Sequence, residues 1–94
     1  MAQTIEGDYD GNLVVQANQR ITVAGDVNGD LKVGEGAAVS VEGDVNGMVE
    51  AAKGSRVAVR GDVNGDLVTQ GDVVVEGEVN GNIDASGGRL AVRG

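Results

Sequence analysis

A nine-residue unit recurs along the whole chain and limits what it can fold into. The unit occupies residues 21–29, 39–47, 57–65 and 73–81, and each copy ends in Gly-Asp-Val-Asn-Gly or Gly-Glu-Val-Asn-Gly. The glycines that mark it are separated by 18, 18, 18, 16 and 17 residues and lie at Gly7, Gly25, Gly43, Gly61, Gly77 and Gly94. Such a period is too short for a helical hairpin, so the chain is predicted to be a solenoid of small turns.

The pattern within each unit is typical of short β-strands. Val39 and Val41, like Val57 and Val59, are spaced by two residues, while Gly and Asn interrupt the apolar runs every four to six residues. Apolar or small residues also recur at every sixth position, at Ile21, Val27, Val33, Val39, Val45, Ala51, Val57, Val63 and Thr69. Three six-residue segments, each forming one side, make one triangular coil of 18 residues. We therefore predict an all-β, three-sided parallel β-helix of about five to six coils, with 16–18 residues per coil.

Stacking the coils predicts which residues lie above one another. One expected column contains Val27, Val45, Val63 and Val79, and another contains Leu31, Val49, Leu67 and Ile83. The irregular repeat lengths are expected at a single corner, because a strand cannot change length without losing register. That corner follows Val33 in one coil, and its glycines are Gly34, Gly36, Gly54, Gly71, Gly87 and Gly88.

The composition of the chain excludes several classes of partner and location. The chain forms one domain, over residues 1–94, and its net charge of −8 opposes binding to nucleic acid or to an anionic membrane. It has no Cys and no apolar segment long enough for membrane insertion, and its first residues lack a secretion signal. We expect a cytoplasmic protein without direct membrane insertion.

No catalytic set is evident. The absence of His removes the base and metal ligand on which hexapeptide-repeat acyltransferases and β-helical carbonic anhydrases depend. We expect no enzyme activity, no cofactor and no metal site. Two polar columns are predicted instead, one of which could be a divalent-ion site or, more in keeping with its spacing, a solvated turn face; it contains Asp8, Asp26, Asp44, Asp62 and Glu78. The other is expected to be a ladder of stacked amides and contains Asn28, Asn46, Asn64 and Asn80.

The two ends of the solenoid are the remaining candidates for a functional surface. Repeat units extend from Ile5 to the final Leu-Ala-Val-Arg-Gly, so we expect both ends to lack a capping segment. An uncapped end exposes strand edges and apolar side chains, which favours end-to-end self-association through the terminal coils. The expected interface residues are Ile5, Leu13, Leu90 and Val92. A left-handed hexapeptide-repeat oligomer and a non-polymerising adaptor remain alternatives.

The repeated Val-x-Val-x-Gly-Asp-Val-x-Gly-x-Leu units resemble the core domain of bactofilins, the polymer-forming β-helical cytoskeletal proteins of bacteria and some archaea. The resemblance covers essentially the whole chain. It implies a right-handed β-helix that polymerises through its terminal coils without nucleotide and scaffolds other proteins. Many bactofilins carry a Phe near the C-terminal end that serves polymerisation, and this chain, which has no Phe, offers Leu90 and Val92 near that position.

Overall fold

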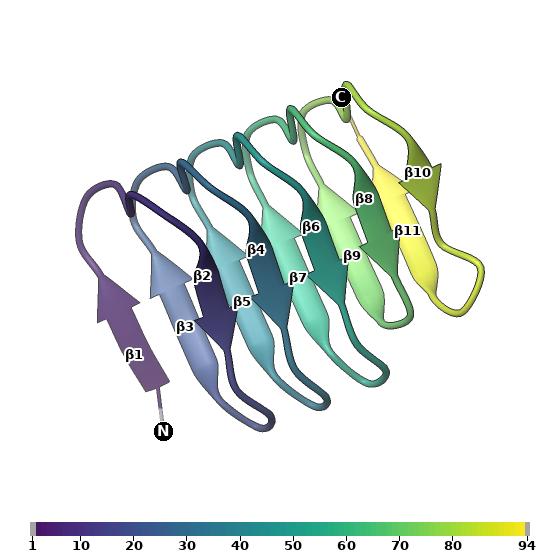
Figure 1. The fold of residues 1–94 in the computed structure, drawn as a ribbon, viewed down its shortest axis with the longest axis horizontal. Helices are drawn as coiled ribbons and strands as arrows, with labels where there is room; N and C mark the ends of the chain where they lie inside the picture. Colours follow the sequence, from purple (N-terminus) through teal and green to yellow (C-terminus); the bar gives the residue numbers. More distant parts are fainter. Residues whose placement is uncertain (1, 94) are drawn as a thin grey trace.

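In the computed structural model, which describes residues 2–93, the chain winds into a parallel β-solenoid of about five turns and forms no helix (Figure 1). The predicted β-helix is therefore confirmed. Each full turn uses two short strands and a third side without a regular strand. The strands are β1 Ala2–Ile5, β2 Leu13–Val15, β3 Arg20–Val23, β4 Leu31–Val33, β5 Ala38–Val41, β6 Val49–Ala51, β7 Arg56–Val59, β8 Leu67–Thr69, β9 Asp72–Val75, β10 Ile83–Asp84 and β11 Arg89–Val92.

The strands form two sheets in which every pairing is parallel. The six-stranded sheet has the order β1-β3-β5-β7-β9-β11, and the five-stranded sheet has the order β2-β4-β6-β8-β10. The chain ascends in the six-stranded sheet behind and descends in the five-stranded sheet in front while the coils advance from left to right (Figure 1), so the solenoid is right-handed. Both predicted columns of stacked apolar residues are present, one as single bridges and one in the five-stranded sheet.

The third side is less regular than the sequence suggests. It contains only single-residue bridges, which join Tyr9, Val27, Val45, Val63 and Val79 in that order. Each valine has an acidic residue before it and an asparagine after it, and a glycine on each side beyond these. Glycine and asparagine favour turns over extended strands, so only the central residue pairs with the next coil.

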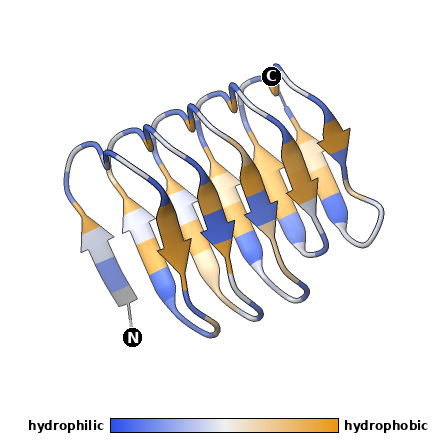
Figure 2. Cartoon of the chain, in the orientation of Figure 1, coloured by the Kyte–Doolittle hydropathy of each residue, from blue (hydrophilic) through white to orange (hydrophobic). Residues whose placement is uncertain are grey.

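The core is a narrow column of branched aliphatic side chains. Strand residues alternate between buried and outward positions, as in β3, where Ile21 and Val23 are buried on either side of Thr22. Apolar residues on the strands form bands along the solenoid, whereas the connections are mostly hydrophilic or neutral apart from single apolar positions (Figure 2). Two neighbouring coils cover each interior residue, so Val27, Val45 and Val63 have no exposed surface. Burial of this kind contributes about 25 cal/mol per Å² of apolar surface.

Variation in coil length is confined to one corner, as predicted. The register between β7 and β9 corresponds to an offset of 16 residues, and that between β9 and β11 to 17, but the strands on both sides remain aligned. In the 16-residue coil the Thr69 hydroxyl donates to the Gly71 carbonyl at 3.0 Å and accepts from the Gly71 N–H at 3.0 Å. In the preceding coil the buried Ser55 bonds to the Ala52 carbonyl. A buried hydroxyl thus closes each of these two corners.

Candidate assembly surfaces and polar ladders

The C-terminal end of the solenoid exposes apolar residues that its interior coils bury. Ile83 is 48% exposed and Val92 is 42% exposed, while Val79 and Leu90 are partly buried against the core. These four side chains occupy the last positions of columns that continue through the whole molecule. Among residues 2–93, β11 pairs only with β9 and β10 only with β8, so one edge of each strand has no backbone partner. This end therefore combines apolar surface with open strand edges.

The N-terminal end is more polar. Ile5 and Tyr9 are partly buried against the core, but Gln3 occupies the inward column that continues with Ile21. Leu13, which lies beside Leu31 of the next coil, is only 5% exposed. The strands β1 and β2 each have a single neighbour within the described chain. This end thus presents open edges with less exposed apolar surface than the opposite end.

The four residues predicted for the interface therefore differ in their placement. Ile5, Leu90 and Val92 all belong to terminal strands and are at least partly accessible, whereas Leu13 is buried and offers little surface to a second molecule. The sequence prediction omitted Ile83, the most exposed large apolar residue at the C-terminal end. Its place at the end of the column through Leu67 could have identified it, since that column was correctly predicted.

An acidic ladder runs along one edge of the solenoid. Asp26 N–H donates to Asp8 Oδ1 at 2.9 Å, and the same bond, at 2.8 Å, links each later residue of the column to the one before it. Each aspartate therefore caps a backbone N–H of the following coil, a role that sequence reasoning did not foresee. Among residues 2–93, no group of three or more potential ligands is arranged to hold a metal ion.

The glycines beside this ladder make room for its carboxylates. At Gly43 an added Cβ would collide with Asp26 Oδ1 and would lie 2.9 Å from the Gly25 carbonyl oxygen. Gly61 has the same relation to Asp44. The repeated Gly-Asp pair is thus explained by close approach of consecutive coils rather than by a special backbone angle.

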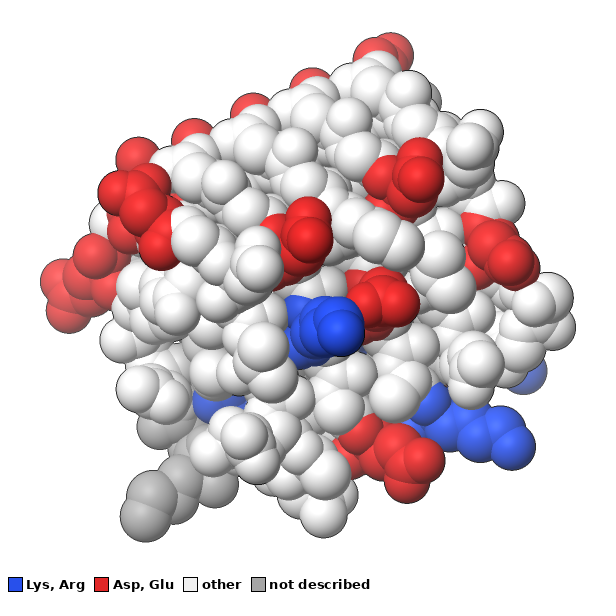
Figure 3. Space-filling model, viewed as in Figure 1, with Lys and Arg blue, Asp and Glu red and all other residues white. Residues whose placement is uncertain are grey.

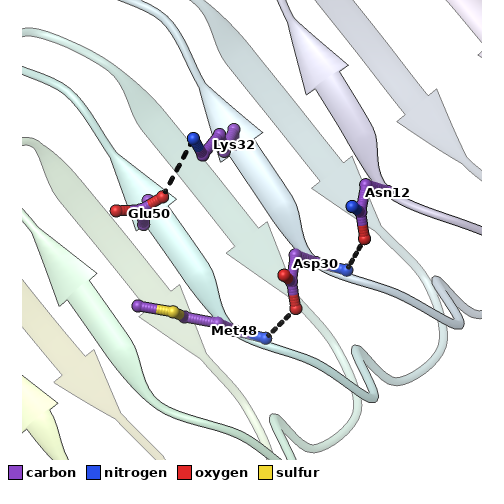
Figure 4. Close-up of polar contacts among 5 residues, drawn as sticks. All are labelled: Asn12, Asp30, Lys32, Met48 and Glu50. Carbon is purple, nitrogen blue, oxygen red and sulfur yellow. Dashed lines mark hydrogen bonds and ion pairs between the residues drawn. The ribbon is translucent and has the colours of Figure 1, made fainter.

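A second ladder is interrupted in the middle. Asp30 N–H donates to Asn12 Oδ1 at 3.0 Å, and Met48 N–H donates to Asp30 Oδ1 at 3.0 Å (Figure 4). Met48 has no side-chain oxygen, so it offers no such acceptor to Asp66 N–H in the next coil. The ladder resumes where Asn82 N–H donates to Asp66 Oδ1 at 3.0 Å. The chain therefore contains a natural gap in an otherwise regular column.

The predicted amide ladder is confirmed. Asn46 Nδ2 donates to Asn28 Oδ1 at 2.7 Å, and the bond repeats through Asn64 and Asn80. The first member of the column is Asp10, which accepts from Asn28 Nδ2 at 2.7 Å. An ionised carboxylate has no proton to donate, so this ladder ends at the N-terminal coil.

Charge is distributed unevenly over the molecule. Acidic side chains follow one another along the upper edge in Figure 3, beside a face with few cations. On the five-stranded sheet, Lys32 Nζ and Glu50 Oε2 lie 3.6 Å apart, which is the only ion pair within residues 2–93. Both side chains are exposed, so the pair contributes less than about 1 kcal/mol. The described chain also has no helix that is long and apolar enough to cross a lipid bilayer.

The comparisons with protein-family models, curated proteins and solved structures gave no match for this chain. The fold and the surfaces described above are therefore the basis for inferring its function.

Proposed function

We propose that this protein is a structural scaffold that self-assembles end to end into filaments without nucleotide. The observation that carries the proposal is the uncovered state of both ends within residues 2–93. Four terminal strands have an open edge, and the C-terminal columns finish in Ile83 and Val92, which are 48% and 42% exposed. A regular open edge beside apolar surface recruits further strands.

In such a filament each molecule would extend both sheets of its neighbour. The first strand of a sheet in one molecule would pair with the last strand of that sheet in another, and the apolar columns would continue across the junction. Burying the exposed halves of Ile83 and Val92 would contribute about 1 kcal/mol each, in addition to the backbone hydrogen bonds. The C-terminal side of each junction should contribute most of the newly buried apolar surface, because Ile83 and Val92 are the more exposed side chains.

This chain resembles bactofilins in its repeat sequence, coil length and β-helical fold, and this resemblance supports the proposal. By that resemblance the filament would act in the cytoplasm, would have no enzyme activity or cofactor, and would position other proteins on its sides. The net charge of −8 makes nucleic acid an unfavourable partner and also opposes self-association. Added salt should therefore promote assembly, because it screens the repulsion between molecules.

Negative-stain electron microscopy of the purified protein at low and high salt tests the proposal. We expect unbranched filaments a few nanometres wide that become longer or more numerous as salt is raised. Discrete small particles at both salt concentrations would instead indicate a closed oligomer or a monomeric adaptor. Light scattering that falls steadily with added monovalent salt would contradict the role given to charge.

Arginine substitutions can locate the contact. Ile5→Arg and Val92→Arg each place a charge in a terminal column and should abolish filaments, because an unpaired charge buried at a junction costs several kcal/mol. Val14→Arg is the matched control, since Val14 lies in the N-terminal coil but is 56% exposed on the outer side of the five-stranded sheet. Filaments should persist in that variant. Unchanged filaments in both terminal variants would refute end-to-end stacking.

A further inference from the structure

The outer face of the six-stranded sheet differs from the rest of the surface. Its outward side chains form three columns along the solenoid, and we call this surface the arginine face. The central column contains Thr4, Thr22, Ser40, Ala58, Val74 and Ala91. One flanking column contains Arg20, Ala38, Arg56, Asp72 and Arg89. The other contains Glu6, Ala24, Glu42, Arg60, Glu76 and Arg93, five of which extend the backbone ladder one residue beyond the strands.

The arginine face contains all five arginines of the chain but only four of its fifteen acidic residues. Its net charge is therefore +1, whereas the remainder of the chain carries −9. Self-repulsion between two copies of this acidic molecule is consequently weaker where two such faces meet than where the acidic parts of the remaining surface meet.

The charged residues on this face have no ion-pair partners among the residues that the structure describes. Neither Glu42, Arg60 nor Glu76 makes an ion pair with another residue in the described range, although they are neighbours in one column. The face also has a shallow hollow of about 350 Å³ between the arginine column and the small side chains of the central column. The surface is thus open and carries charges of both signs that form no ion pair within residues 2–93.

We propose that the arginine face binds the same face of a second copy, with the two solenoids antiparallel. A two-fold axis parallel to the strands, passing between β5 and β7, places β5 of one molecule opposite β7 of the other. The same operation places β3 opposite β9 and β1 opposite β11. Each column then lies against itself in reverse order, as an isologous interface requires.

This arrangement matches opposite charges along both flanking columns. Glu42 lies opposite Arg60 of the second copy, Glu6 opposite Arg93, and Arg20 opposite Asp72, and symmetry repeats each pair once. The remaining opposed positions combine a charge with an alanine, such as Ala38 with Arg56 and Ala24 with Glu76. No like charges meet. In the central column only small or β-branched side chains meet, which permits close approach of the two sheets.

The parallel alternative is unfavourable. A two-fold axis along the solenoid would place each strand opposite its own copy with reversed direction, so the two flanking columns would exchange places. Arg60 would then meet Arg56, Glu76 would meet Asp72, and Arg93 would meet Arg89. Like charges in direct opposition are destabilising. The charge pattern therefore selects the antiparallel arrangement.

The size of the face sets the strength of this contact. Six strands about 4.8 Å apart and about five residues wide cover roughly 400 Å² per molecule, which is half of what one partner contributes to an ordinary stable interface. A single pair of molecules should therefore associate weakly. Repetition of the contact along a filament would strengthen it through effective concentration. The pairing itself does not depend on end-to-end assembly.

Cysteine cross-linking tests the arrangement, because the native chain has no cysteine. Thr22→Cys and Val74→Cys variants are mixed, refolded together at high concentration and treated with a short bismaleimide. Antiparallel pairing places residue 22 opposite residue 74, whereas two copies of residue 22 would lie about three strand spacings, roughly 14 Å, apart along the solenoid. We expect the 22–74 cross-link to exceed the 22–22 and 74–74 products about tenfold. Dominance of the 22–22 and 74–74 products, or no cross-link at all, would overturn the proposal.

Charge reversal provides a second test. Glu42→Arg and Arg60→Glu should each lower the 22–74 yield about tenfold, because each converts two attractive pairs into repulsive ones. The double variant restores both pairs and should recover the yield. Lys32→Glu and Glu50→Lys make the same charge changes on the five-stranded sheet, where the yield should stay constant. Failure of the double variant to recover would overturn the assigned register.

The two assemblies can fail separately. Residues 22 and 74 lie in strands that have neighbours on both sides, so contact between solenoid ends cannot produce their cross-link. Cross-linking without filaments would refute the end-to-end proposal alone, and single filaments without the 22–74 product would refute the face-to-face proposal alone.

Discussion

Equivalent residues in the interior and terminal coils occupy the same position in the repeat but have very different surroundings. Val75 has no exposed surface, whereas Val92, which pairs with it one coil later, is 42% exposed. Leu67 is fully buried, whereas Ile83 in the same column is 48% exposed. The two residues of each pair lie in register in adjacent parallel strands. What differs is the number of coils that cover them.

Burial in this fold is therefore supplied by neighbouring coils on both sides. An interior coil has two such neighbours, and a terminal coil has one within the described chain. The stability of a solenoid is accordingly close to a sum of interfaces between adjacent coils. Any molecule that covers the last coil would give its residues a second neighbouring coil, as an interior coil has.

Introducing a charge should give the largest difference in stability between an interior and a terminal coil. Val75→Arg would bury an unpaired charge and should abolish folding, because the cost of several kcal/mol approaches the total stability of a small domain. Val92→Arg should keep the β-sheet circular dichroism spectrum and a cooperative thermal transition, since its side chain can reach water. If both variants unfold, the terminal coil is not the partly exposed site described here.

Truncation of a side chain should give a smaller contrast. Leu67→Ala removes a fully buried side chain and should cost about 2–5 kcal/mol in free energy of unfolding. Ile83→Ala should cost about 1 kcal/mol in the monomer, because half of its surface is already exposed. Urea denaturation under conditions that prevent assembly measures both. Equal losses would contradict the difference in burial. In filaments the cost at Ile83 should rise toward that at Leu67.

In the acidic ladder, removal of an interior carboxylate and of the terminal one should differ by about 1 kcal/mol in free energy of unfolding. Asp44→Ala leaves Asp62 N–H without its acceptor and should destabilise by about that amount. Glu78→Ala removes the same charge from the last coil, where its carboxylate accepts no hydrogen bond from residues 2–93, and should change stability by a few tenths of a kcal/mol at most. Faster amide hydrogen exchange at Asp62 in the Asp44 variant identifies the cause. Similar effects of both substitutions would show that charge, not capping, dominates.

The smallest effect should come from repairing the interrupted ladder. Met48→Asn supplies the missing oxygen acceptor for Asp66 N–H without adding charge, and it should stabilise by less than about 1 kcal/mol. Met48→Ala is the control, because it removes the same side chain without providing an acceptor. Slower hydrogen exchange at the Asp66 amide in the asparagine variant alone would confirm the repair. Equal exchange in both variants would show that water already satisfies this N–H.

Most of the fold could be predicted from the sequence, because residues at equivalent positions of successive repeats lie next to one another in a solenoid. The spacing of six placed Val27, Val45 and Val63 in one column, and the changes in repeat length located the variable corner correctly. The extent of strand on each side was harder to predict. Only one residue pairs on the third side, because glycine and asparagine dominate it.

The candidate surfaces were less predictable. The exposure of a side chain at either end depends on how far each coil of the solenoid advances along its axis. Leu13 is buried and Ile83 is exposed, although both belong to terminal coils. The bonds from the Asp26 and Asp44 carboxylates to the next coil depend on the three-dimensional rise between coils, which residue identity does not contain. The arginine face required the register of every strand, since its charges are dispersed along the chain.

The corner that varies in length makes this solenoid suitable for carrying added segments. Loss of two residues there leaves Val73 paired with Val57, and the closely packed columns on either side do not shift. Lys53 and Gly54 lie exposed at the same corner one coil earlier. A peptide grafted between them would leave the molecule along one edge without entering the core. In a linear assembly such grafts would form a row, and the length of one molecule would set the distance between successive grafted peptides.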